Sequence, residues 1–197
     1  MKKIFFAITI IIWSFAAKAQ VYDGITQPTF FRWWMPVTYN GGDVSASPFV
    51  GLRFNVNDWL NFTPVAQYHM NSQVFVPQLW VNVNHDGKYF LLQRFAYNTK
   101  SEKVFYTLSG TARLPEKFMV DFTWFNLAEN LSINPGNRLQ ILAGRDFGLF
   151  VLNAGYAFHG KAGFVTNLRI RATNLSWLQF RYDTGIKAFQ LSTAIHL

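Results

Sequence analysis

Single arginines recur along the chain at positions where they share one face of an alternating segment. The cases that we single out are Arg53, Arg94, Arg113, Arg169, Arg171 and Arg181, with Asp121 as a carboxylate on the same kind of face. A guanidinium keeps its positive charge, and its planar fork of donors suits carboxylate and phosphate groups. Rings of such side chains favour anions. We therefore predict that these residues line a surface that binds or conducts small anionic solutes.

The same faces carry further polar side chains and few carboxylates. Besides Asp121, only Asp183 is placed there, near a rim. Because Arg113 and Asp121 flank the turn at Pro115–Lys117, we expect them to face each other across it. We interpret Arg145 and Asp146 as a rim pair. The other residues expected on these faces are Arg32, Gln67, Gln78, Asn82, Asn153, Asn167, Gln179 and Gln190.

Nucleophilic, metal and nucleic-acid chemistry have weaker support. His69 and Ser72 are the only base and nucleophile that we find at the expected outer rim, and no third residue orients the histidine. The four histidines have no ligand spacing, and the lack of cysteine excludes a thiolate zinc site. We predict no metal and no cofactor. The arginines are spread singly, which argues against a nucleic-acid partner.

The segments that position these residues alternate apolar and polar side chains over about ten residues and then turn, which predicts β-strands. In one segment Val50, Leu52 and Phe54 share a face opposite Gly51 and Arg53. About ten residues is also the length that a tilted strand needs to cross a bilayer. We predict twelve strands, with ten as the next choice, over residues 29–38, 48–57, 59–69, 74–84, 88–98, 104–114, 118–126, 138–146, 148–158, 163–172, 175–183 and 186–197.

The connections between the predicted strands alternate in length through most of the chain. The longer ones are Tyr39–Ser47, Met70–Gln73, Thr99–Lys103 and Leu127–Asn137, and tighter turns lie between them. Bacterial barrels have short periplasmic turns and longer external loops, so the alternation agrees with an even number of strands. We expect the loop Leu127–Asn137 either to fold inward as a constriction or to form an external binding surface. Asp86-Gly87 predicts a tight hairpin.

Composition separates a membrane barrel from a soluble sandwich, which alternation alone cannot do. Charged residues make up 14% and aromatics 18% of the chain. Soluble domains have about a quarter of their residues charged. Without Lys2, Lys3 and Lys18, the chain has 15 basic and 10 acidic residues, a net charge of +5. The low charge content favours an outer face in contact with lipid.

The first residues have the pattern of an export signal. Lys2 and Lys3 precede an apolar stretch, and Ala17-Lys18-Ala19 fits an A-x-A cleavage site. We predict a secretory signal peptide over residues 1–19 and a short periplasmic segment over 20–28. Residues 29–197 then form a single barrel domain.

The last predicted strand has apolar residues at every second position apart from Thr193, namely Phe189, Leu191, Ile195 and the final Leu197. With the export signal and the alternating strands, the chain resembles outer-membrane β-barrel proteins of Gram-negative bacteria. The resemblance implies an all-β, up-and-down antiparallel transmembrane barrel in the cell outer membrane, surrounded by lipid. It also implies recognition of the last strand by the barrel-assembly machinery. That family signal typically ends in Phe or Trp, whereas this chain ends in Leu.

These observations predict a monomeric, porin-like barrel that gives passive passage to, or binds, small and mainly anionic solutes through an arginine-lined lumen. Two alternatives stay open. One is a non-conducting structural or accessory barrel that acts with another outer-membrane complex. The other is a lipid-modifying outer-membrane enzyme, for which His69 and Ser72 are the only site that we can propose. An enzyme is the less favoured interpretation.

Overall fold

The computed structural model describes residues 31–126, 138–173 and 176–196, and these residues are mostly β-strand. The predicted signal peptide, the segment 20–28, the loop Leu127–Asn137 and Leu197 lie outside the described residues. One short 3-10 turn, η1 (Pro115–Lys117), lies between β8 and β9. The strands are β1 (Phe31–Asn40), β2 (Asp43–Ala46), β3 (Phe49–Leu52), β4 (Phe54–Asn55), β5 (Leu60–His69), β6 (Val74–His85), β7 (Tyr89–Asn98), β8 (Lys103–Arg113), β9 (Phe118–Asn126), β10 (Arg138–Asp146), β11 (Phe150–Phe158), β12 (Gly163–Arg171), β13 (Ser176–Asp183) and β14 (Ala188–His196).

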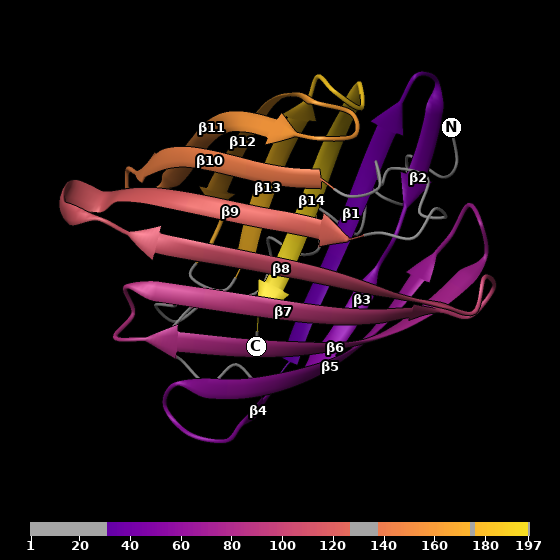
Figure 1. The fold of residues 1–197 in the computed structure, drawn as a ribbon, viewed down its shortest axis with the longest axis horizontal. Coiled ribbons are helices and arrows are strands. Elements are labelled where there is room, and N and C mark those ends of the chain that lie inside the picture. The colour runs from indigo at the N-terminus through magenta and orange to yellow at the C-terminus, as the bar shows by residue number, and fades with distance from the viewer. Residues whose placement is uncertain (1–30, 127–137, 174–175, 197) are drawn as a thin grey trace.

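The strands form one antiparallel sheet that closes on itself (Figure 1). From β5 to β14 each strand pairs with the next one along the chain, and β14 pairs with β1 over nine residues, from Arg32↔His196 to Asn40↔Ala188. Strands β2, β3 and β4 follow one another between β1 and β5 as one interrupted segment. Twelve segments therefore surround the lumen, which confirms the predicted antiparallel barrel and its strand number.

The second segment begins earlier than predicted, so the expected loop Tyr39–Ser47 is wrong. Gly41 and Gly42 have φ angles of 59° and 114°, a conformation that glycine adopts without steric cost. The turn lets Asp43 pair directly with Asn40. The strand is then interrupted between Ala46 and Phe49, beside Pro48, which has no N–H to donate to a sheet.

The tight turns occur where the sequence predicts them. Asp86 and Gly87 have φ angles of 53° and 65°, and they are the two central residues of a turn that the Lys88 N–H closes on the His85 carbonyl at 3.0 Å. At η1, Glu116 and Lys117 take similar angles, 55° and 63°, without a glycine. These turns join strands whose pairing continues directly on either side.

The two faces of the barrel differ in composition. Outward side chains are large and apolar, as with Leu79 and Phe164, which are 42% and 67% exposed. The inward face includes fully buried polar residues such as Thr63, Asn82 and Asn153. The alternation of side chains along each strand therefore places the apolar face outside and the polar face inside. Among the described residues, no helix is long and apolar enough to cross a membrane.

One part of the inward face is apolar. Phe49 lies between Trp34 and Trp80, with ring centroids 5.3 Å from each, and Val65 and Leu92 pack against this group. These residues come from β1, β3, β5, β6 and β7, so the cluster covers one wall of the lumen. The rest of the inward face is available for the polar residues described next.

Candidate functional site

The candidate site is the inward face of the barrel, because the register brings the predicted arginines there. Directly paired residues in a sheet share a face. Arg94 is paired with the buried residues Trp80 and Thr107, and Arg169 is paired with buried Val151. By the same argument, Arg113, Arg171 and Arg181 face inward through their pairs Met119, Trp177 and Asn167. Arg53, between β3 and β4, is 6% exposed.

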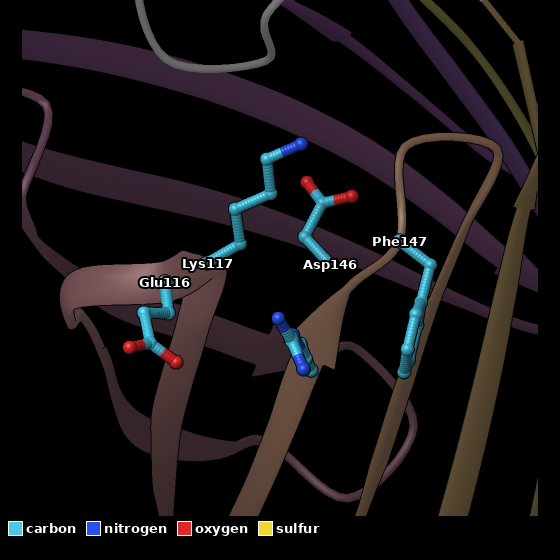
Figure 2. Close-up of a pocket in the computed structure, with 5 residues that line it drawn as sticks. Glu116, Lys117, Asp146 and Phe147 are labelled. Carbon is cyan, nitrogen blue, oxygen red and sulfur yellow. The ribbon is translucent and has the colours of Figure 1, made fainter.

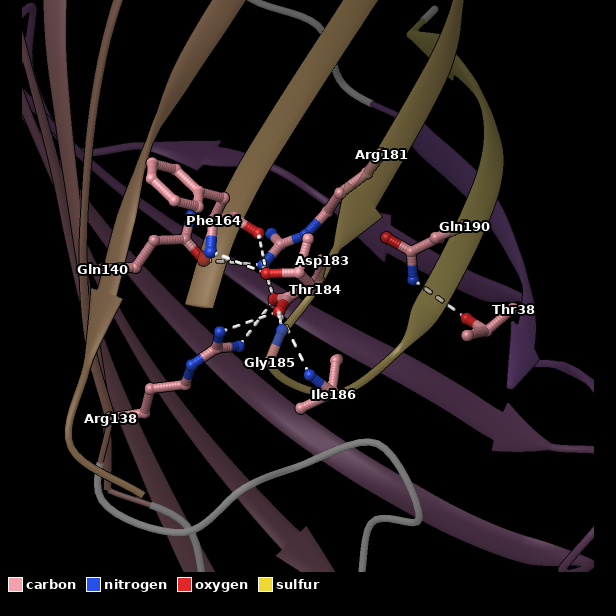
Figure 3. Close-up of polar contacts among 10 residues, drawn as sticks. All are labelled: Thr38, Arg138, Gln140, Phe164, Arg181, Asp183, Thr184, Gly185, Ile186 and Gln190. Carbon is pink, nitrogen blue, oxygen red and sulfur yellow. Dashed lines mark hydrogen bonds and ion pairs between the residues drawn. The ribbon is translucent and has the colours of Figure 1, made fainter. Parts of the chain in front are cut away.

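The densest polar cluster, here called the mouth network, consists of Arg138, Gln140, Arg181 and Asp183 (Figure 3). Arg138 donates from both terminal nitrogens to the Asp183 carboxylate, at 2.6 and 2.8 Å, and both side chains are 1% exposed. Arg181 donates to Gln140 Oε1 at 2.6 Å and lies 3.5 Å from Asp183 Oδ2. One carboxylate therefore holds two guanidinium groups.

The mouth network joins two strands that are not neighbours in the sheet. Arg138 and Gln140 lie on β10, whereas Arg181 and Asp183 lie on β13, and β11 and β12 separate these strands in the sheet. The intervening strands present small side chains inward at this level, Ala157 on β11 and Gly163 on β12, which are directly paired. Small residues there leave room for the long arginine side chains to reach across.

A second cluster lies toward the opposite end of the barrel, around Trp177. The guanidinium carbons of Arg169 and Arg171 lie 5.6 and 5.4 Å from the centroid of the Trp177 ring. Such contacts attract a cation to the negative face of the ring. Arg171 also forms an ion pair with Asp146, with N–O distances of 2.6 and 3.2 Å. Arg169 forms no ion pair with a carboxylate among the described residues.

Arg94 and Arg113 have no directly bound carboxylate in the described part of the chain. Arg94 donates to the hydroxyl of Thr107 at 3.3 Å, which leaves its positive charge without an anionic partner in contact. Arg113 ends β8 and is exposed at the lumen end. A guanidinium has five donors, so both side chains retain capacity for a further anionic group.

The predicted pair of Arg113 and Asp121 is wrong. The register places Asp121 opposite Thr111, and Arg113 opposite Met119, two residues away. Asp121 accepts a hydrogen bond from Thr111 Oγ1 at 2.6 Å and another from Asn153 Nδ2. Two neutral donors, and no arginine, therefore hold this carboxylate.

Arg145 and Asp146 lie at the rim, where β10 ends, but their predicted pairing is wrong because successive strand residues point to opposite faces. Asp146 faces inward and binds Arg171, while Arg145 faces outward over the ring of Phe118. Asp146 is thus a third inward carboxylate that sequence reasoning did not place in the lumen. Arg138 was missed as well, although its alternation with Gln140 and Leu142 on a predicted strand could have identified it.

The inward strand face has a clear excess of positive charge. In the described strands, together with Arg53 in the link between β3 and β4, this face has eight arginines and three aspartates, an excess of five positive charges. The arginines are Arg32, Arg53, Arg94, Arg113, Arg138, Arg169, Arg171 and Arg181; the aspartates are Asp121, Asp146 and Asp183. Exposed Asp43 and Lys103 lie at the mouth, and their opposite formal charges leave this excess unchanged.

The residues considered for nucleophilic chemistry are not brought together as predicted. His69 faces inward, opposite Val74, and its Nδ1 lies 2.7 Å from the Ser47 hydroxyl, not from Ser72. No carboxylate contacts His69 among the described residues. Nor do three His, Asp or Glu side chains in the described ranges gather in an arrangement that could hold a metal ion.

The fold is similar to that of solved outer-membrane porins. A structure of KdgM porin matches with a TM-score of 0.59 and 9% identity, over 84% of this chain and 99% of that one. A structure of KdgM porin in complex with disordered oligogalacturonate matches with a TM-score of 0.60 and 10% identity, over the same shares. No protein-family model matches the sequence, and none of the curated proteins does. At this identity the likeness shows the fold alone, a closed antiparallel β-barrel like that of these porins.

Proposed function

We propose that this protein is a porin-like channel of the outer membrane that passes or binds small anionic solutes. The observation that carries the proposal is the inward excess of eight arginines over three aspartates in a barrel with the fold of a porin. Fixed positive charge in a water-filled passage attracts anions and repels cations. The apolar outer face fits a barrel whose exterior contacts lipid.

Two pairs of these arginines have different roles in this proposal. Those in the mouth network, Arg138 and Arg181, are already bound to Asp183 and shape the passage. Arg94 and Arg169 have no bound carboxylate among the described residues and are therefore the candidates to contact a solute. Passage requires contacts that replace part of the solute's hydration but remain weak enough to release it.

A carboxylate-bearing solute is the class that this lumen fits best. A planar guanidinium binds a carboxylate through two parallel hydrogen bonds. One structural neighbour, KdgM porin, is described in complex with oligogalacturonate, whose sugar units carry carboxylates. Twelve strands enclose a narrower interior than the sixteen to eighteen strands of wide porins. The cluster of Trp34, Phe49 and Trp80 occupies part of that width, which favours small solutes.

The test is the reversal potential of the refolded protein in a planar bilayer under a tenfold KCl gradient. We expect steady conductance steps and a reversal potential of the sign for chloride selectivity. Arg94→Gln and Arg169→Gln should each reduce the selectivity, and the double variant should reduce it further, because each removes one fixed charge from the lumen.

Lys161→Gln is the matched control, since it removes one positive charge from an exposed turn outside the strands. It should leave the reversal potential within the error of the native protein. Cation selectivity, or an equal loss of selectivity in the control, would contradict the arginine-lined passage. A silent bilayer with correctly folded protein would favour the non-conducting, accessory barrel.

A further inference from the structure

The outward face contains one arginine in the described strands, Arg145 near the end of β10. It pairs directly with Phe118 and Leu152, which are 43% and 46% exposed and belong to the apolar outer face. A charged residue on the lipid face costs a few kcal/mol at the bilayer midplane but about 0–1 kcal/mol near the interfaces. A position one residue from the end of its strand therefore places Arg145 at the level of lipid headgroups.

Aromatic rings surround this guanidinium. Its central carbon lies 4.9 Å from the ring centroid of Phe118 and 5.8 Å from that of Phe147. Phe147 is 50% exposed, in the turn that follows β10. Arg145 forms no hydrogen bond or ion pair with the described residues, so its charge is without an anionic partner from them.

A carboxylate lies in the same hollow. Glu116, in η1, lines with Arg145 and Phe147 a shallow, open depression of about 470 Å³ at this rim. Lys117 and Asp146 complete its lining. In Figure 2 the side chains of Lys117 and Asp146 point to one side, and those of Glu116 and Phe147 point to the opposite side. Asp146 is bound to Arg171, whereas Glu116 has no bound cation among the described residues.

We infer that this hollow binds the headgroup of a zwitterionic aminophospholipid, with Arg145 on the phosphate and Glu116 on the ammonium group. Two exposed charges of opposite sign that line one depression and form no ion pair with each other match a headgroup that has both charges. The aromatic rings lie where interfacial aromatic residues contact lipid near the headgroups. The inference goes beyond the proposed channel, since it requires a barrel in lipid and does not require conduction.

Native mass spectrometry of the refolded full chain tests the site by titrating it with phosphatidylethanolamine or phosphatidylglycerol. Both lipids carry a phosphate, and only the first carries an ammonium group. We expect the native protein to bind phosphatidylethanolamine more tightly by roughly two- to fivefold, the range of an exposed charge pair. Glu116→Gln should abolish this preference, and Arg145→Gln should weaken the binding of both lipids.

Lys88→Gln is the control, because Lys88 is an exposed cation in a turn at the same end of the barrel but outside the hollow. It should keep the native preference. Unheated gel mobility reports whether each variant is folded. Equal affinity of the native protein for the two lipids, a preference that survives Glu116→Gln, or an equal effect of the control would overturn the inference. The conductance variants Arg94→Gln and Arg169→Gln test the channel independently of this result.

Discussion

The inward arginines differ in how the protein neutralises them. Arg138 and Arg181 share Asp183, Arg171 is bound to Asp146, and Arg94 donates to the hydroxyl of Thr107 but to no carboxylate of the described residues. A buried ion pair often stabilises a protein no more than a pair of apolar residues in the same place would. Loss of one partner alone is strongly destabilising, because it leaves the other charge buried without compensation. The mouth network is therefore the place where a single neutral substitution should have the largest effect on stability.

We predict that Asp183→Asn destabilises the barrel by about 3–5 kcal/mol, because the variant leaves Arg138 and Arg181 without their shared carboxylate. Urea unfolding in detergent micelles, followed by tryptophan fluorescence, measures the change. Asp86→Asn makes the same chemical change in an exposed turn and should alter stability by less than about 0.5 kcal/mol. Equal stability of the two variants would show that the network does not contribute as inferred.

At the scale of elements, tight turns fix which residues of adjacent strands pair. Gly41 and Gly42 let Asn40 pair directly with Asp43, and the turn at Asp86–Lys88 brings His85 opposite Tyr89. A shift of one residue would turn every arginine on a strand from the lumen to the lipid face. The turn residues therefore position the lumen chemistry although they do not take part in it.

We predict that Gly87→Ala destabilises the barrel by about 1–2 kcal/mol, since its φ of 65° is costly for a residue with a Cβ. No atom lies within 4 Å of the added methyl group, so the effect comes from the backbone alone. Urea midpoints of Gly87→Ala and of the neighbouring surface variant Lys88→Ala give the comparison. A midpoint for Gly87→Ala equal to that of Lys88→Ala would mean that the turn relaxes to another conformation.

At the scale of the whole molecule, closure of β14 on β1 gathers arginines from β1 to β13 around one lumen. The field of the excess positive charge acts over the length of the passage, so the proposed selectivity should depend on the ionic strength of the solution.

We predict that chloride selectivity falls as salt rises, because the screening length decreases from about 10 Å at 0.1 M to about 3 Å at 1 M. Reversal potentials under the same tenfold gradient, centred on low and on high salt, measure the change. Selectivity that stays constant between these conditions would indicate a direct binding site at a narrow constriction instead of a distributed field.

The sequence by itself determined the strands, the two faces and the inward position of the predicted arginines. Alternation has a period of two residues, so it can be identified within one strand without knowledge of its neighbours. Asp86-Gly87 identified a hairpin for the same local reason. The start of the second segment was missed because the glycine turn at Gly41 and Gly42 was interpreted as a loop.

The partners of the charged residues were decided by the tertiary structure. Arg138 and Asp183 are 45 residues apart and lie on strands that are not neighbours in the sheet. Their contact depends on the closure and stagger of the whole barrel, which no local pattern specifies. The ion pair of Asp146 with Arg171 likewise joins β10 to β12, which are separated in the sheet by β11. Faces are a local property of the chain, whereas contacts across the lumen and at its rim are a property of the closed sheet.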